Sequence, residues 1–223
     1  MMKKSMSAAR TEIFEIENPA LNVTTISSDV RIVESDDGRI VVEIYANTED
    51  GRKLAENAEI SVIGSTISVE VGKGNRGLKD LFGFNDSGMS LIVRVPKTSV
   101  INVKAVSADV EVDVTSVNLE ITTVSGDVTT RRNPTSRCNV KTVSGDVVAH
   151  TFSGCEYTLK SVSGDLTVHV APGLEIEVDG KSISGEMTSE ISLDDSSDST
   201  FASAGTVMIS ASTVSGDFSL ARD

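Results

Sequence analysis

Acidic residues recur at one position of a repeated pattern, two residues after a serine. The pattern reads VSADV at Ser107, VSGDV at Ser125 and Ser144, VSGDL at Ser163, ISGEM at Ser184 and VSGDF at Ser215. The acidic residues at this position are Asp109, Asp127, Asp146, Asp165, Glu186 and Asp217. If the repeats stack as neighbouring strands, these carboxylates form a ladder with a spacing of about 5 Å.

Two kinds of chemistry fit such a ladder. Carboxylate oxygens are the ligands that Ca²⁺ prefers, so Asp127, Asp146 and Asp165 are candidate cation ligands. The pattern favours a structural role instead, because Asp is a turn former and the Ca²⁺-binding nonapeptide Gly-Gly-x-Gly-x-Asp is absent. Hydrogen bonds from amides of the turn and from the serine hydroxyl would offset a repulsion of about 1 kcal/mol per pair.

The two histidines of the chain, His150 and His169, both lie six residues after a motif serine. We therefore expect them to be neighbours on adjacent repeats, in a column between Arg131 and Glu190. A surface pair of this kind can bind Zn²⁺ or Cu²⁺, but the sequence offers no obvious third ligand. Chance stacking on an exposed face is the favoured interpretation.

Cys138 and Cys155 are the only cysteines and can form one disulfide bridge or none. Cysteine often packs as a small hydrophobic residue, so we expect two buried thiols.

The residues around the motif identify the elements that carry it. Apolar residues occupy the positions six and four before the serine, directly before it and three after it, whereas the residues between are mostly polar. A period of two predicts strands with one buried face. The alternation slips by one residue just before the serine, which predicts a corner or bulge there. Glycine after the serine suits a turn, and because Ser28 and Ala108 replace it, we expect the turn to prefer glycine without requiring it.

These repeats predict an all-β fold, a single-domain right-handed β-solenoid or β-helix. Successive motif serines from Ser107 to Ser215 lie 18, 19, 19, 21 and 31 residues apart, and rungs of about 18–21 residues cannot bury an apolar face alone. Stacking buries the columns, and parallel crossovers are nearly always right-handed. An earlier copy, ISSDV at Ser27, obeys the same rule. We expect a disordered N-terminus over 1–11 and a solenoid over 12–223, with N-terminal strands and a cap over 12–100 and regular rungs over 101–223.

The motif is absent between Arg39 and Pro96, where four further strands are predicted. They form either coils without the motif or an antiparallel meander that caps the stack. Two stretches, 72–88 and 193–205, read as insertions. The first carries Leu81, Phe82 and Phe84 in a polar setting, which makes them candidates for a partner-binding site or for packing over the stack, with a mobile loop as the simpler interpretation.

The composition excludes several functional classes. A net charge of −13 repels phosphate backbones, so nucleic acid is not expected as a partner. No stretch approaches the roughly 18 apolar residues of a membrane span. The start, MMKKSMSAAR, has no apolar run behind its basic residues, so a cytoplasmic location is expected if Met1 is the native start. An export signal upstream would place the protein at the cell surface.

The stretch SLIVRVPKTSVINVKAVSADVEV, followed by repeated VSGDV, resembles the bacterial putative-adhesin family, a domain of unknown function. The resemblance covers roughly Val23 to Phe218, including a strand that ends in a proline such as Pro96. It implies a β-helix-like solenoid, an adhesin-like role and no catalytic residues. Many relatives carry a membrane anchor or an export signal, which this sequence lacks.

A non-enzymatic scaffold or adhesin-like interaction module is therefore the expected function. It would present a rigid acidic face to a protein or glycan partner without a cofactor, and its open ends could self-associate. The alternative is a carbohydrate-active lyase or hydrolase on a β-helix, which needs clustered carboxylates in an aromatic-lined groove. Ice binding is a third hypothesis. It would use the hydroxyl column of Thr123, Thr142, Ser161, Ser182 and Thr213, but a second threonine column is missing.

Overall fold

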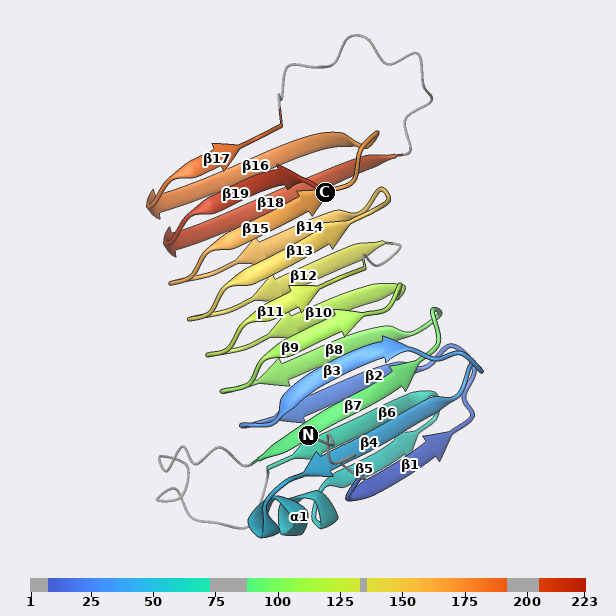
Figure 1. The fold of residues 1–223 in the computed structure, drawn as a ribbon. Coiled ribbons are helices and arrows are strands. Elements are labelled where there is room, and N and C mark those ends of the chain that lie inside the picture. Colours follow the sequence, from blue (N-terminus) through green and yellow to red (C-terminus); the bar gives the residue numbers. More distant parts are fainter. Residues whose placement is uncertain (1–7, 73–87, 133–135, 192–204) are drawn as a thin grey trace, which may run out of the picture.

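The computed structural model describes residues 8–72, 88–132, 136–191 and 205–223. In these residues the strands form two open sheets that face each other, one with nine strands and one with ten (Figure 1). The all-β repeat fold expected from the sequence is confirmed. No helix in this part of the chain has the length and apolarity needed to cross a membrane.

The nine-stranded sheet has the order β16-β18-β14-β12-β10-β8-β2-β6-β5. Its strands are β2 (Ala20–Thr25), β5 (Glu59–Ile63), β6 (Thr66–Val71), β8 (Val100–Ala105), β10 (Asn118–Thr122), β12 (Arg137–Lys141), β14 (Glu156–Lys160), β16 (Glu175–Ser184) and β18 (Thr206–Ser215).

The ten-stranded sheet has the order β1-β4-β7-β3-β9-β11-β13-β15-β19-β17. Its strands are β1 (Arg10–Phe14), β3 (Asp29–Glu34), β4 (Ile40–Ala46), β7 (Met89–Val95), β9 (Val110–Asp113), β11 (Val128–Thr130), β13 (Val147–Thr151), β15 (Leu166–Val170), β17 (Met187–Ser189) and β19 (Phe218–Arg222).

Each repeat is one coil: a strand of the nine-stranded sheet, a corner at the Ser-Gly-Asp motif, and the next strand in the ten-stranded sheet. Neighbouring coils pair in parallel with equivalent residues opposite each other, as Leu119 pairs with Cys138 and Cys138 with Tyr157. Side chains at these positions point between the sheets and are buried. The columns six before, four before and three after the serine are thus core columns, as the period of two predicts.

The order of coils in space differs from their order in the sequence at both ends. The Ser27 coil lies directly against the Ser107 coil, with Leu21 opposite Ile101 and Val30 opposite Val110. The last coil of the chain, β18–β19, is inserted between β14–β15 and β16–β17. Ser215 consequently pairs with Ser163, and β16–β17 forms the end of the stack.

Both structures considered for residues 39–96 occur. The strands β6 and β7 form one more coil without the motif, parallel to β2 and β3. Beyond this coil β4 runs antiparallel to β7, β1 antiparallel to β4, and β5 antiparallel to β6. The N-terminal end of the stack is therefore capped by antiparallel strands. β1 begins at Arg10, inside the stretch expected to be disordered.

A helix, α1 (Glu49–Glu56), lies at this capped end and was not predicted. Its first turn is acidic, and the side chain of Thr48 caps it by accepting a hydrogen bond from the Gly51 N–H at 2.9 Å. Ala55 is fully buried in the core. Thr48 followed by Glu49 and Asp50 was the sequence signal for this helix.

Candidate functional site

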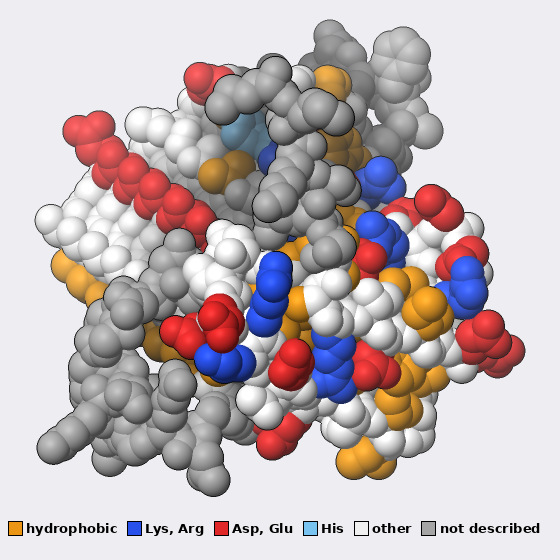
Figure 2. All heavy atoms as spheres, turned by 60° about the horizontal axis from the view of Figure 1, so that its bottom comes forward, with side chains coloured by type: hydrophobic (Ala, Val, Ile, Leu, Met, Phe, Trp, Pro, Cys, Tyr) orange, Lys and Arg blue, Asp and Glu red, His pale blue; other side chains and the backbone are white. Residues whose placement is uncertain are grey.

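The corners line up into a continuous surface, which we call the corner ridge. It consists of the residue before each motif serine, the serine itself and the acidic residue two positions later. Figure 2 shows on the left a straight row of acidic side chains and, parallel to it, a row of hydrophobic ones. The hydrophobic row contains Val106, Val124, Val143, Val162 and Val214, which are 43–48% exposed, and Ile183 at the end of the stack, which is 81% exposed.

The exposure of this valine column corrects the sequence interpretation, which counted it among the buried columns. The alternation does not slip: Leu119, Ile121 and Thr123 all point inward, so Val124 points outward. The strand geometry prevails over hydrophobicity because successive side chains of a strand lie on opposite faces. The hydroxyl column is buried at Thr123, Thr142, Ser161 and Thr213. This excludes the ice-binding hypothesis, which needs these hydroxyl groups at the surface.

A buried threonine is accommodated at the corner because its hydroxyl binds the turn. Thr123 Oγ1 donates to the Ser125 carbonyl at 3.2 Å. Thr25 Oγ1 accepts from the Ser28 N–H at 3.0 Å in the first copy of the motif. The threonine thereby satisfies backbone groups that the turn leaves free of the sheet ladders.

Glycine at the corner is required rather than preferred, which corrects the sequence expectation. Gly145 has a φ of +135°, and a Cβ atom there would lie 2.2 Å from the Gly126 carbonyl oxygen of the preceding coil. Gly126, Gly164 and Gly216 have equally close contacts. Ala108, by contrast, does not have a positive φ, so the corner of its coil has a different backbone conformation.

The acidic column connects each coil to the next. Asp109 Oδ1 accepts from the Asp127 N–H, Asp127 Oδ1 from the Asp146 N–H, and Asp146 Oδ1 from the Asp165 N–H, each at 2.9 Å. The same bond joins Asp165 to Asp217 and Asp217 to Glu186, at 2.8 Å each. The structural role of Asp is thus borne out, but the amide belongs to the neighbouring coil and not to the turn's own backbone.

Among the described residues, no group of three or more His, Cys, Asp or Glu side chains is arranged to hold a metal ion. Cation binding by Asp127, Asp146 and Asp165 stays an untested hypothesis. Their Oδ1 atoms are engaged with backbone amides, while their side chains remain exposed on the corner ridge.

A shallow hollow of about 460 Å³ lies on the outer face of the ten-stranded sheet, beside the first acidic residues of the ridge. Asp29, Asp109 and Asp127 line it together with Glu111. The three aspartates accept hydrogen bonds from backbone amides of adjacent coils, and Glu111 forms ion pairs with Arg31 and Arg131. No aromatic side chain is among the described residues that line this hollow, so it lacks a stacking surface for a sugar.

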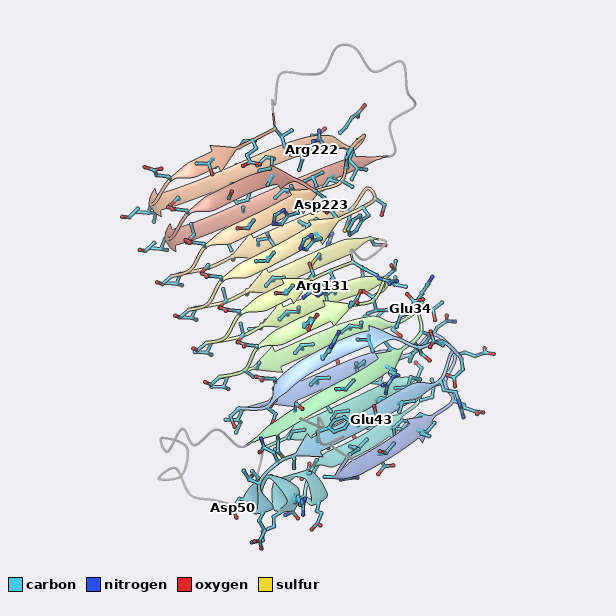
Figure 3. All side chains as sticks on the ribbon, in the orientation of Figure 1. Glu34, Glu43, Asp50, Arg131, Arg222 and Asp223 are labelled. Carbon is cyan, nitrogen blue, oxygen red and sulfur yellow. The ribbon has the colours of Figure 1, made fainter. Side chains whose placement is uncertain are left out.

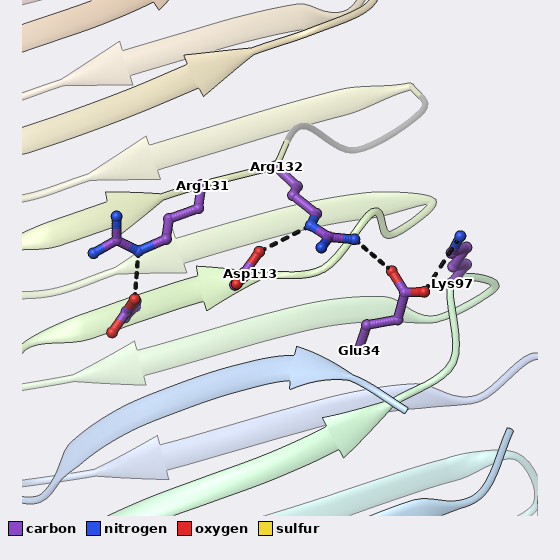
Figure 4. A network of polar contacts seen from close by, with 6 residues as sticks. Glu34, Lys97, Asp113, Arg131 and Arg132 are labelled. Carbon is purple, nitrogen blue, oxygen red and sulfur yellow. Dashed lines mark hydrogen bonds and ion pairs between the residues drawn. The ribbon is translucent and has the colours of Figure 1, made fainter. Parts of the chain in front are cut away.

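Ion pairs continue along the outer face of the same sheet (Figure 4). Glu34 lies between Lys97, at 3.3 Å, and Arg132, at 3.0 Å, and Arg132 also contacts Asp113 at 2.9 Å. These side chains are partly exposed, so the pairs contribute little to stability. They join coils distant in sequence.

His150 and His169 are neighbours on β13 and β15, as predicted, and their rings stack with centroids 4.7 Å apart. The residue on the far side of His169 is Ala221 and not Glu190, because β19 is inserted there. Asp223, labelled in Figure 3, lies 3.2 Å from His150 Nδ1 and 3.8 Å from His169 Nδ1. The sequence gave no sign of this carboxylate, because the insertion of β19 brings it there.

The two cysteines are free and buried, as expected. Burial raises the pKa of the Cys155 thiol to about 11 and raises the pKa of Cys138 further above its usual range. Tyr157 is fully buried beside them and donates a hydrogen bond to the His150 carbonyl at 3.1 Å. Its pKa is raised by the same loss of hydration. These thiols are part of the core and do not resemble activated nucleophiles.

The candidate partner-binding residues Leu81, Phe82 and Phe84 lie outside the described residues.

Comparisons with known proteins agree with this architecture. A family model described as Toastrack DUF4097 matches residues 18–154 and 113–221. A solved "putative cell adhesion protein" from Clostridium sporogenes is similar over 96% of this chain and 99% of its own, with 10% identity and a TM-score of 0.59. A "putative adhesin" from Bacteroides fragilis is similar over 96% of both chains, with 14% identity and a TM-score of 0.54. At these identities the likeness concerns the fold. No curated protein matches the chain.

Proposed function

Because this chain belongs to the Toastrack DUF4097 family, we propose that it is a non-enzymatic, adhesin-like interaction module whose corner ridge contacts a protein or glycan. The observation that carries this proposal is the parallel course of two exposed ladders, one of valine and one of carboxylates, along successive coils. A ridge of this kind offers the same contact repeatedly at the strand spacing of about 4.8 Å.

The chemistry of the two ladders suits a partner with both apolar and donor groups. The valine side chains leave nearly half of their surface in water, and covering them is favourable by about 25 cal/mol per Å². Each aspartate uses Oδ1 to hold the next coil, which leaves Oδ2 for hydroxyl or amide donors of the partner. Because the backbone fixes both ladders, little conformational entropy is lost when the partner binds.

Binding to glycan and protein arrays tests this proposal. The triple substitution Val124→Thr, Val143→Thr, Val162→Thr keeps side-chain shape and should weaken binding about ten-fold or more. The matched control replaces three exposed aliphatic residues away from the ridge with threonine: Ile13, Val62 and Val100. The control should leave affinity within a factor of two.

A second pair of variants separates charge from structure. Asp127→Asn and Asp146→Asn retain the Oδ1 acceptor that holds the next coil and remove the negative charge. Reduced binding without a change in melting temperature would support a direct role of the carboxylates. Cleavage of an arrayed polysaccharide by the wild-type chain would instead support the carbohydrate-active enzyme and overturn the proposal.

The sense of the coil and the compartment belong to the same proposal. A right-handed coil follows from the general preference of parallel crossovers. A cell-surface location fits an adhesin-like role, and fractionation of cells that express the full-length protein would test it.

A further inference from the structure

The two ends of the stack are built differently (Figure 1). At the N-terminal end the antiparallel strands β1, β4 and β5 extend the sheets, and α1 packs there with Ala55 fully buried. At the other end β16 and β17 are the last strands of their sheets, each paired on one side. An edge strand presents a row of unpaired N–H and C=O groups that can pair with another chain.

The backbone of β16 defines which groups face the open edge. β16 pairs with β18 from Glu175 opposite Thr206 to Ser184 opposite Ser215. The Glu175 N–H donates to the Gly205 carbonyl at 3.1 Å, so the backbone groups of Glu175 point toward β18. Because these groups alternate in direction along a strand, the N–H and C=O of Ile176 and Val178 point away from β18.

The core columns continue to this edge and end there uncovered. Ile176 and Val178 are half-buried, whereas the residues opposite them on β18, Val207 and Ile209, are 0% and 2% exposed. One further strand with inward apolar side chains would cover Ile176 and Val178, as each coil covers the one before it.

The outward side chains of β16 indicate the charge of such a strand. Glu175, Glu177 and Asp179 are exposed, and the residues opposite them on β18 are the uncharged Thr206, Met208 and Ser210. The recorded partners of the three carboxylates are the Thr206 hydroxyl, 3.3 Å from Glu175, and Lys181 on the same strand, 3.5 Å from Asp179.

Elsewhere in the sheets outward carboxylates meet a basic side chain on the neighbouring strand. Glu156 on β14 pairs with Arg137 on β12 at 2.9 Å, and Glu43 on β4 pairs with Arg94 on β7. On β16 the inner neighbour supplies no cation, so the complementary charge has to come from the open side. The same three carboxylates, in a chain with a net charge of −13, disfavour a second copy of this edge as the occupant.

We propose that β16 is a strand-addition site for an extended segment of another protein in which apolar residues alternate with Lys or Arg. The segment forms main-chain hydrogen bonds with Ile176 and Val178, and its apolar side chains lie over these two residues. Its basic side chains face Glu175, Glu177 and Asp179. In strand addition of this kind, main-chain hydrogen bonds give affinity and alternate side chains give specificity.

A ten-residue peptide of alternating Val and Lys, with blocked ends and a fluorescent label, probes the site in the intact chain. Fluorescence anisotropy should show saturable binding. A shuffled peptide of the same composition without alternation, and a peptide of alternating Val and Glu, should bind at least ten-fold more weakly. The peptide should slow amide exchange at Ile176 and Val178.

The substitution of three carboxylates locates the site. Glu175→Gln, Glu177→Gln, Asp179→Asn should weaken binding about ten-fold, because each opposite-charge pair across strands contributes about 0.2–1 kcal/mol. The matched control Glu15→Gln, Glu17→Gln, Glu56→Gln makes the same change in net charge with exposed residues at the other end, and should change affinity less than two-fold. Equal losses in the two variants would show unspecific charge attraction and overturn the proposal.

Backbone methylation tests the pairing itself. Methylating one set of alternate amides of the peptide should abolish binding, and methylating the other set should leave it, because one row of amides faces β16. Equal binding by both methylated peptides would overturn strand addition. Slow exchange at Ile176 and Val178 in a dimer of the unliganded chain would assign the edge to a second copy and overturn it as well.

Discussion

The carboxylate of Asp127 accepts a hydrogen bond from the backbone N–H of Asp146, which lies one coil further along the stack, at 2.9 Å. The bond recurs from coil to coil and closes a gap in the backbone ladder at the corner, where the chain leaves one sheet for the other. The motif aspartate thus acts between coils, and this relationship leads to the first prediction.

Asp146→Ala should lower the free energy of unfolding by about 1–2 kcal/mol, because the Asp165 N–H loses its acceptor. Asp146→Asn should lower it by less, since the amide oxygen still accepts. Urea unfolding followed by circular dichroism measures both. Glu17→Ala, an exposed acidic residue outside the ridge, is the control and should stay within about 0.5 kcal/mol of wild type.

Gly145→Ala should destabilise the stack by more than about 3 kcal/mol, since its Cβ would lie 2.2 Å from the Gly126 carbonyl oxygen and its φ is positive. Gly38→Ala is the matched control: Gly38 also has a positive φ, of +75°, but no atom lies within 4 Å of the added Cβ. Its cost should be about 1–2 kcal/mol, from the backbone alone. Similar costs for the two substitutions would show that the close approach of coils does not determine the glycine.

Two valines of one coil distinguish core from corner. Val140→Ala should cost about 2 kcal/mol because Val140 is fully buried. Val143→Ala should cost less than about 1 kcal/mol, because Val143 is 48% exposed. Thermal or urea unfolding of the two variants gives the comparison. The reverse order would restore the interpretation in which the valine before the serine is a core residue.

The buried thiols predict an alkaline loss of stability. In the unfolded chain a cysteine loses its proton near pH 9, whereas folded Cys155 keeps it to about 11. The unfolded state therefore binds fewer protons in this window, and the free energy of unfolding falls as pH rises from about 9 to 11. A variant with Cys138→Ala and Cys155→Ala should show a shallower slope, measured by urea unfolding at several pH values.

The same burial predicts slow chemistry at these thiols. At pH 8 an aromatic disulfide reagent should label neither Cys138 nor Cys155 in the folded chain and should label both in urea. Rapid labelling of the folded chain would contradict the buried positions of the two side chains.

Much of the fold followed from the sequence because a strand has a fixed period. Leu119, Ile121 and Val128 recur with the same spacing in neighbouring repeats, and a period of two determines which side chains face the core. The pairing of His150 with His169 followed from the same count. The valine before the serine was misassigned because hydrophobicity was weighed above that period, although the alternation through Thr123 was visible.

The sequence by itself determined that equivalent residues lie over one another, since each repeat carries its own apolar columns. Only the tertiary structure decided which repeat lies beside which: Ser27 against Ser107, and Ser215 between Ser163 and Ser184. The physical reason is that all coils present nearly the same columns, so the local pattern is compatible with several neighbours. The choice depends on long-range closure of the chain, which also brings Asp223 to the histidine pair and leaves β16 at the open end.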